Sequence, residues 1–157
     1  MLEVRDRGDT RMSATPVWVY ADVVCDLFHY GHIEFFRQAQ SLGDALVVGL
    51  VGDADAASYK ALPVLSFPER LAMVRACRYV DRVLEQPAPL HADAAFLDRI
   101  GAAYCCHGDD MSADELRFWY GALVDTGRLK VVHYTAGIST RQIFERVAQR
   151  LHQRGLG

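Results

Sequence analysis

Residues 17–51 read VWVYADVVCDLFHYGHIEFFRQAQSLGDALVVGLV, two apolar runs joined by a helical pattern. The first run, residues 17–24, is rich in β-branched and aromatic side chains, as buried strands are. Over residues 32–42 the apolar side chains recur at helical spacing, and Gly43 ends that pattern. Residues 45–51 are continuously apolar, which is typical of a parallel strand covered on both faces. This stretch therefore predicts a strand, a helix and a second, parallel strand.

The same alternation continues along the rest of the chain. The pattern predicts further strands over residues 80–84, 102–106 and 129–133. It predicts helices over residues 68–77, 93–100 and 114–124, and a last amphipathic helix after Gly137, with Ile143, Val147 and Leu151 four residues apart. The segment 52–67 has mixed character and is predicted to be a loop. Strands that alternate with helices five times predict an α/β fold, a Rossmann-like doubly wound sheet of five parallel strands in a single domain.

The composition fits one globular domain and excludes several classes of protein. The chain has 157 residues, of which 51% are hydrophobic and 24% charged, and its formal net charge is −3. The hydrophobic fraction excludes a disordered chain, and no apolar run reaches the roughly 20 residues that span a bilayer. The slight acidic excess argues against a nucleic-acid binder. We assign the domain to residues 16–157 and a flexible, polar N-terminal arm to residues 1–15.

The four cysteines form no C-x-x-C pair. Two of them, Cys105 and Cys106, are neighbours in a predicted strand, so their side chains point to opposite faces and do not readily share a metal ion. The first eleven residues lack the hydrophobic stretch of a secretory signal. We therefore expect buried, reduced thiols in a cytoplasmic protein.

Histidines gather at one edge of the predicted sheet. His29 and His32 follow the first strand, His107 follows the fourth and His133 ends the fifth. Open α/β sheets bind ligands beyond the carboxyl ends of their strands, so four of the six histidines fall where a ligand is expected. Together they indicate a site that handles negative charge or protons.

The strongest local signal is DLFHYGH, residues 26–32, at the junction of the first strand and helix. His29 and His32 are three residues apart at a helix start, so both side chains can face one ligand. Backbone N–H groups and the partial positive charge of the helix N-terminus suit a phosphate. Two alternatives remain: the histidines only cap the helix, or they bind a metal, although no third ligand follows at a standard spacing.

Four ordered motifs carry a family resemblance. His29-Tyr30-Gly31-His32 resembles the H-x-G-H signature of the nucleotidyltransferases. Residues 107–110 (HGDD) resemble the H-G-D-D of phosphoethanolamine cytidylyltransferases, and residues 135–140 (TAGIST) resemble their R-T-x-G-I-S-T segment. Glu69-Arg70, with residues 78–81 (RYVD), resembles their E-R helix and the turn after it. The resemblance runs from about residue 17 to 147 and extends to the glycerol 3-phosphate cytidylyltransferases.

The resemblance implies a reaction in which a phosphate or phosphonate oxygen of a small acceptor attacks the α-phosphorus of CTP and releases pyrophosphate. It implies a magnesium cofactor and a homodimer, with CTP and the acceptor as partners. The implied catalytic residues are His29, His32 and Lys60. The implied nucleotide contacts are Cys25, Asp26, His107, Gly108, Asp109, Tyr134, Gly137, Ile138, Ser139 and Thr140. Arg70 and Arg78 would bind the acceptor, and Asp26 and Asp109 would bind magnesium.

Each of these residues also has a plain structural interpretation. Lys60 could be a solvated loop charge, Arg70 and Arg78 could form surface salt bridges, and Ser139 could be an ordinary helix cap. An adenylyltransferase of the same superfamily, for nicotinamide mononucleotide or pantetheine phosphate, is an alternative function, as is a nucleotide-binding module without turnover.

The chain departs from the family pattern at the phosphate end. Tyr134 stands where the family has arginine, and Arg141 stands where it has a small hydroxyl residue. Val23 and Cys25 replace a glycine and an aromatic residue before Asp26. A guanidinium relocated by seven positions is one explanation of the first two departures. The departures, and the short chain, also favour a phosphonate as an acceptor.

Overall fold

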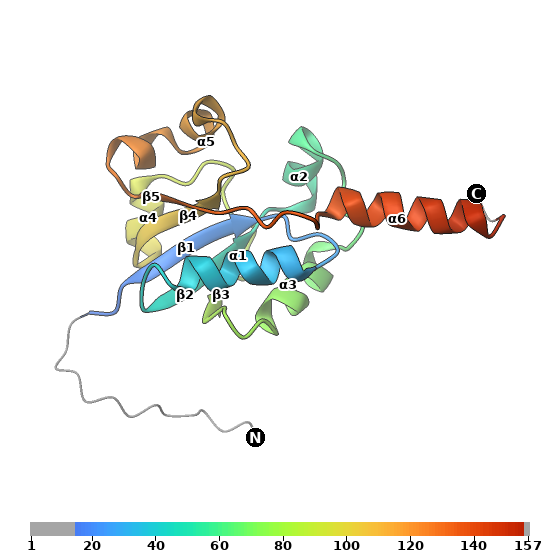
Figure 1. Ribbon diagram of the computed structural model, residues 1–157. Helices are drawn as coiled ribbons and strands as arrows, with labels where there is room; N and C mark the ends of the chain where they lie inside the picture. Colours follow the sequence, from blue (N-terminus) through green and yellow to red (C-terminus); the bar gives the residue numbers. More distant parts are fainter. Residues whose placement is uncertain (1–14, 156–157) are drawn as a thin grey trace, which may run out of the picture.

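The computed structural model describes residues 15–155 (Figure 1). Most of the arm expected over residues 1–15 therefore lies outside the described residues. The described chain forms one α/β domain around a central sheet, with helices on both faces, as the sequence predicts.

The sheet has five parallel strands. They are β1 (Trp18–Val23), β2 (Ala45–Leu50), β3 (Arg82–Val83), β4 (Ala102–Gly108) and β5 (Leu129–Val132). Their order in the sheet is β3-β2-β1-β4-β5, and every neighbouring pair is parallel. The chain thus builds outward from β1 in one direction and then, through β4 and β5, in the other. This reversal confirms the predicted doubly wound topology and leaves a crevice at the carboxyl ends of β1 and β4.

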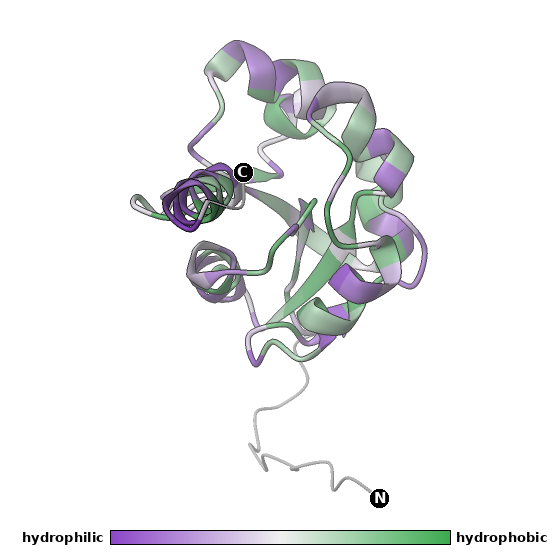
Figure 2. Ribbon diagram, turned by 90° about the vertical axis from the view of Figure 1, so that its right-hand side faces the viewer, coloured by the Kyte–Doolittle hydropathy of each residue, from purple (hydrophilic) through white to green (hydrophobic). Residues whose placement is uncertain are grey.

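The two faces of the sheet carry separate hydrophobic clusters because side chains alternate along each strand. Cys106 belongs to the cluster that packs with α1 (Tyr30–Gln40) and α3 (Phe67–Arg75), whereas Cys105 belongs to the cluster with α4 (Ala94–Ile100) and α5 (Ala113–Asp125). Figure 2 shows the apolar strands enclosed between these helices. The opposite orientation predicted for the two thiols is confirmed, and all four cysteines are free.

One helix was not expected. Residues 53–59 form α2 (Asp53–Tyr59), so the prediction of a loop over residues 52–67 is wrong for its first half. The helix is short and buries only Ala56, so it has no apolar period to detect. Asp53 and Asp55 in its first turn favour the N-terminus of a helix. The strand expected over 80–84 shrinks to two paired residues, β3.

The last helix, α6 (Thr140–Gln153), extends away from the body of the domain (Figure 1). None of its residues is buried, and Phe144, Val147 and Leu151 are exposed. Within the described residues, no helix is long and apolar enough to cross a membrane.

Candidate active site

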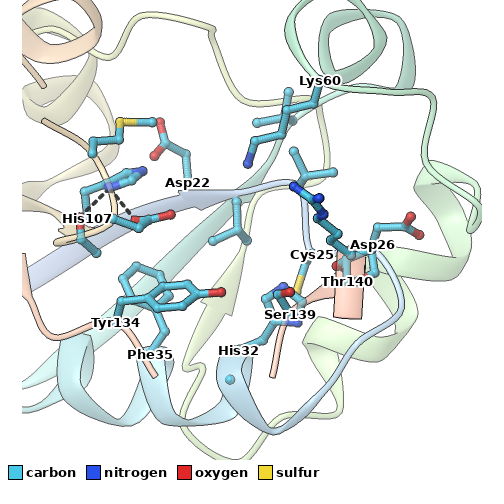
Figure 3. A pocket seen from close by; sticks show the side chains of 18 of the residues that line it. Asp22, Cys25, Asp26, His32, Phe35, Lys60, His107, Tyr134, Ser139 and Thr140 are labelled. Atoms are coloured by element: carbon cyan, nitrogen blue, oxygen red, sulfur yellow. Dashed lines mark hydrogen bonds and ion pairs between the residues drawn. The ribbon is translucent and has the colours of Figure 1, made fainter. Parts of the chain in front are cut away.

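A cavity of about 470 Å³ opens at the carboxyl ends of β1 and β4. Its walls come from the β1–α1 junction, the segment after α2, the β4–α5 connection and the segment that leads into α6. The three expected catalytic residues all line it, and so do most of the expected nucleotide contacts: Cys25, Asp26, His107, Gly108, Tyr134, Ile138, Ser139 and Thr140. Segments more than a hundred residues apart in the sequence therefore meet in one place (Figure 3).

The side chains of His29 and His32 cap the start of α1. The Nδ1 atom of His29 accepts the N–H of Gly31 at 3.1 Å, and the Nδ1 atom of His32 accepts the N–H of His29 at 3.2 Å. A neutral imidazole that accepts through Nδ1 carries its proton on Nε2. Both rings therefore cap the helix with one nitrogen and keep an Nε2–H donor for another partner. The capping role, an alternative in the sequence, is therefore confirmed, and it leaves the Nε2 side of each ring available for a ligand.

Burial keeps the two rings neutral. It is the largest cause that lowers the pKa of His32, to about 3, and the nearby His29 and Lys60 lower it further. Burial also lowers the pKa of His29. At neutral pH the pair is therefore a set of hydrogen-bond donors rather than a pair of cations, which suits a site that must donate to phosphate oxygens without moving protons.

Lys60 supplies the positive charge on the other side of the cavity. It ends α2 and is exposed, and Figure 3 shows its side chain extending toward the cavity from the side opposite to His32. The unexpected helix α2 thus explains how a loop lysine is held at the mouth of the site.

Glycine is required where α1 meets the segment before α6. A Cβ atom on Gly31 would lie 2.9 Å from Cε1 of His29, closer than real Cβ atoms pack, and 3.3 Å from Cγ2 of Ile138, a tight contact. Gly137, with φ of +86°, takes a left-handed conformation that favours glycine. The two glycines let the chain bring the N-termini of α1 and α6 to one cavity.

The start of α6 is capped and tied to the β1–α1 junction. The hydroxyl of Ser139 accepts the N–H of Gln142 at 3.1 Å, and the hydroxyl of Thr140 donates to the carbonyl oxygen of Asp26 at 3.0 Å. The cap proposed as an alternative for Ser139 is therefore real. With the N–H of Gln142 taken by Ser139, the N–H groups of Thr140 and Arg141 in the first turn of α6 have no partner within the helix, so they are donors for an anion.

Asp26 organises the backbone around the cavity. Its carboxylate accepts three backbone N–H groups, those of Leu27, Val64 and Leu65, at 2.9–3.0 Å. The residues on either side, Cys25 and Leu27, have positive φ values of 60° and 46°. The carboxylate thus holds a strained turn and the loop before α3 together. Burial raises the pKa of the Cys25 thiol far above its ordinary value, so this side chain is a neutral wall of the cavity.

Asp109 lies behind the cavity and does not line it. Its carboxylate accepts the N–H of Tyr134 at 2.6 Å and contacts Nδ1 of His133 at 3.1 Å, and these contacts lower its pKa. The neighbouring Asp110 lines the cavity instead. Asp109 therefore fixes the segment that carries Tyr134 to the end of β4.

The expected magnesium ligands do not fit a metal site built by the protein alone. The carboxylates of Asp26 and Asp109 are both engaged by backbone N–H groups. Among residues 15–155, no three His, Cys, Asp or Glu side chains are grouped as a metal ion requires. A divalent cation at this site would need most of its ligands from elsewhere.

Arg70 has a structural place rather than the expected contact with an acceptor. Its side chain is fully buried, and it donates to the carbonyl oxygens of Val24, Val51 and Leu65 and to the carboxylate of Asp53. These acceptors take four of the five N–H groups of the guanidinium, which is why a buried arginine is tolerated here. Neither Arg70 nor Arg78 lines the cavity. Arg78 is exposed, with its guanidinium over the ring of Tyr79.

A buried aspartate, paired with a tyrosine, lies in the cavity and was not expected from the sequence. Asp22 is only 8% exposed, and its carboxylate accepts the hydroxyl of Tyr120 at 2.7 Å. Burial raises the pKa of Asp22, against the opposing effects of Tyr120 and His107. A signal was present in the sequence, because Asp22 is the one charged residue within the apolar run 17–24. Tyr59 and Trp119 line the same end of the cavity and pack with ring centroids 5.3 Å apart.

The ring of His107 is oriented by the backbone of the next residue, Gly108. Its Nδ1 atom donates to the carbonyl oxygen of Gly108 at 2.9 Å and lies 3.8 Å from the carboxylate of Asp110 (Figure 3). In the neutral ring Nε2 is then an acceptor, so this histidine offers the opposite hydrogen-bonding character from His29 and His32.

Comparisons with known proteins agree with this geometry. The model of the cytidylyltransferase-like family matches residues 24–146. The ethanolamine-phosphate cytidylyltransferase of Dictyostelium discoideum is 36% identical over 88% of this chain, and the choline-phosphate cytidylyltransferase 2 of Arabidopsis thaliana is 33% identical over 93% of it. The chain spans 38% and 49% of the lengths of these two relatives.

A solved structure shows the same fold. The lipopolysaccharide core biosynthesis protein from Thermoplasma volcanium GSS1 superposes with a TM-score of 0.62, is 24% identical, and matches 78% of this chain and 99% of its own. The family match over residues 24–146 and the identities of 36% and 33% to the curated relatives identify the family as well as the fold. The chain belongs to the cytidylyltransferase-like family.

Proposed function

We propose that the protein transfers CMP from CTP to a small phosphorylated alcohol or phosphonate and releases pyrophosphate. The observation that carries the proposal is the paired Nε2–H donors of His29 and His32 beside the N-terminus of α6, all at one cavity. These neutral donors match the phosphate oxygens of a nucleotide. The names of the curated relatives support CTP as the donor substrate.

The reaction needs positioning and charge neutralisation more than acid or base catalysis. The acceptor oxygen is already anionic at neutral pH, so it attacks the α-phosphorus directly. A bond forms between that oxygen and the α-phosphorus, the bond to the bridging oxygen breaks, and pyrophosphate leaves with the bonding electrons. In this proposal His29 and His32 donate to the α-phosphate and the bridging oxygen, where charge grows in the transition state.

Lys60 and the start of α6 would bring the two anionic substrates together. Lys60, an ammonium group on a flexible stem, would neutralise the α-phosphate and the incoming acceptor. Ser139, Thr140 and the N–H groups after them would hold the β- and γ-phosphates. Magnesium would arrive bound to the triphosphate, which is its usual mode with nucleotides, because Asp26 and Asp109 are engaged elsewhere.

The acceptor pocket carries a further indication of its substrate. Asp22 is a buried carboxylate at the end of the cavity lined by Tyr59, Trp119 and Tyr120. A buried carboxylate is stabilised by a cation, and aromatic faces favour an alkylammonium group. We therefore favour an acceptor with an amine, in keeping with the ethanolamine-phosphate and choline-phosphate named for the relatives. A phosphonate with an amine would satisfy the same contacts.

Base selection is assigned to the β4 end of the cavity. In this proposal Nε2 of His107 and the backbone at Gly108 would meet the amino group of cytosine, next to the ring of Tyr120 at the acceptor end, and Tyr134 would flank the nucleotide. An adenylyltransferase and a non-catalytic nucleotide-binding module remain alternatives that experiment can separate. The homodimer and the cytoplasmic location also stay predictions.

One panel tests the proposal. Pyrophosphate release is measured with CTP, ATP, GTP and UTP, with magnesium present. Each is tested against ethanolamine phosphate, choline phosphate, glycerol 3-phosphate and 2-aminoethylphosphonate, and against nicotinamide mononucleotide and pantetheine phosphate as acceptors of the alternative. We expect turnover with CTP and an amine-bearing acceptor. Turnover with ATP alone would establish the adenylyltransferase, and tight CTP binding without pyrophosphate release from any acceptor would establish the binding module.

A further inference from the structure

The cavity has few fixed positive charges for a ligand as anionic as a nucleoside triphosphate. Among the described residues that line it, lysine and arginine occur only at Lys60 and Arg141, while three aspartates, Asp22, Asp26 and Asp110, face it. The histidines at the start of α1 are neutral donors. Beside any cation that arrives with the nucleotide, Arg141 is therefore the one fixed positive charge among the described lining residues that can complement Lys60.

Arg141 lies where that chain would end. It is the second residue of α6, directly after Ser139 and Thr140, so its side chain shares the cavity rim with the free N–H groups of the first helical turn. Its side chain is 88% exposed and its Nε donates to Oε1 of Glu145 at 3.1 Å. An exposed pair of this kind, four residues apart on a helix, is weak, so a polyphosphate can displace Glu145 readily.

The residue across the turn does not supply the charge. Tyr134 lines the same cavity, but its side chain is uncharged and its hydroxyl lies 3.4 Å from the carbonyl oxygen of Ile138. Thr135, next to it, has a buried hydroxyl oxygen without a hydrogen-bond partner. Thr135 also lines the cavity, so its hydroxyl adds an unpaired polar group to the segment that leads into α6.

We propose that Arg141 binds the terminal phosphates of the nucleotide, exchanging its contact with Glu145 for bidentate hydrogen bonds to the triphosphate. This inference rests on the proposed function and adds a specificity residue to it. Arg141 distinguishes CTP from CMP, whereas Lys60 and the paired histidines act at the α-phosphate. Glu145 pairs with the guanidinium of Arg141 in the protein without nucleotide, and the pair separates when the triphosphate binds.

The test compares the affinities of two nucleotides. Dissociation constants of CTP and CMP are measured by calorimetry for the full chain and for Arg141→Ala. Hydrogen bonds between charged groups contribute about 1.5–3 kcal/mol, so we expect CTP to bind roughly 10- to 100-fold more weakly and CMP to bind within about twofold of the parent chain. Arg150→Ala removes the same charge from the same helix outside the cavity, and it should change neither affinity.

Two further variants separate a ligand contact from a structural role. Arg141→Lys should keep part of the preference for CTP, since it keeps the charge but not the bidentate geometry. Glu145→Gln should bind CTP at least as tightly as the parent chain. Equal losses for CTP and CMP in Arg141→Ala, or a loss in Glu145→Gln as large as that in Arg141→Ala, would overturn the inference. A parent chain that binds no CTP would instead overturn the proposed function, so the two failures are distinguishable.

Discussion

The imidazole rings of His29 and His32 stack with their centroids 3.8 Å apart, each accepting a backbone N–H through Nδ1. This arrangement fixes both tautomers before any ligand arrives. Two Nε2–H donors, on rings tilted by 28°, are therefore preorganised, and no reorientation is needed when charge moves to the leaving group. Preorganised donors of this kind stabilise a transition state far more than a flexible pair would.

His29→Ala and His32→Ala should each lower kcat by about 10²- to 10³-fold, with a much smaller change in the dissociation constant of CTP. The physical reason is that these hydrogen bonds strengthen as the bridging oxygen becomes charged. Steady-state pyrophosphate release and calorimetry measure the two quantities. Tyr30→Phe, which changes an exposed residue between the histidines, is the matched control and should keep its activity. Parallel losses in turnover and in affinity would point to a capping role alone.

Protonation of His32 gives a second prediction. Burial lowers its pKa in the folded state to about 3, whereas a histidine in the unfolded chain titrates near about 6.5. The neutral ring therefore contributes stability that is complete above about pH 6.5 and is lost as pH falls toward about 3. In that window the free energy of unfolding should fall by about 1.4 kcal/mol for each pH unit.

Urea unfolding at several pH values measures this slope, and His32→Asn should reduce it by the contribution of one proton. The NMR resonance of the His32 ring gives an independent reading, because it should not shift between pH 5 and 8. A ring that titrates with a midpoint near 6.5 would contradict the buried, neutral donor described here.

The sequence predicts the fold well and the site in part. The apolar runs of β1 and β2 and the break at Gly43 are local signals, so the βαβ unit follows from them. The H-x-G-H segment likewise carries its own capping geometry. What could not be predicted depends on contacts between distant segments: Arg70 reaches carbonyl groups from three other segments, and its burial leaves no local trace.

Helix α2 and Asp22 illustrate two other reasons. Helix α2 is too short and too polar to show a period, and tertiary packing holds it in place. Asp22 did show a signal, a charge within a buried strand, but a single sequence does not reveal which face of the strand meets a cavity. Its partner Tyr120 is 98 residues away.

Arg70 should prove to be a stability residue. Arg70→Met would leave the carboxylate of Asp53 and three carbonyl groups, one buried and two partly buried, without their donor, and we expect a loss of about 3–5 kcal/mol in the free energy of unfolding. Arg75 lies on the same helix as Arg70 and forms an exposed ion pair with Glu85. Arg75→Ala removes that pair and should lower the free energy of unfolding by less than about 1 kcal/mol. Chemical denaturation compares the two. A stable Arg70→Met variant with a weakened acceptor affinity would restore the substrate contact expected from the sequence.

Asp22 should govern the choice of acceptor. Asp22→Asn keeps the shape and the contact with Tyr120 but removes the charge, so KM for an amine-bearing acceptor should rise by roughly tenfold or more. KM for glycerol 3-phosphate, which has no amine, should stay the same or fall. Tyr120→Phe is the control, since it removes the hydroxyl and retains the carboxylate. An equal rise in KM for both acceptors would show that Asp22 only maintains the pocket.

Lys60→Met tests the other side of the cavity. The substitution keeps the length of the side chain and removes its charge, so two anions would have to approach without neutralisation. We expect kcat/KM for the acceptor to fall by about 10²-fold or more, while CMP, whose one phosphate also contacts Lys60, binds more weakly by a much smaller factor. In the parent enzyme, kcat/KM should depend less on the charge of the acceptor at higher salt, because salt screens the exposed ammonium group.

The control is Lys130→Met, which removes the only other lysine of the chain. The Nζ atom of Lys130 lies over the ring of Tyr104 and outside the cavity, so this substitution should leave kcat/KM unchanged. Full activity in Lys60→Met would mean that the end of α2 is only a solvated surface, and that neutralisation of the α-phosphate comes from the backbone donors alone.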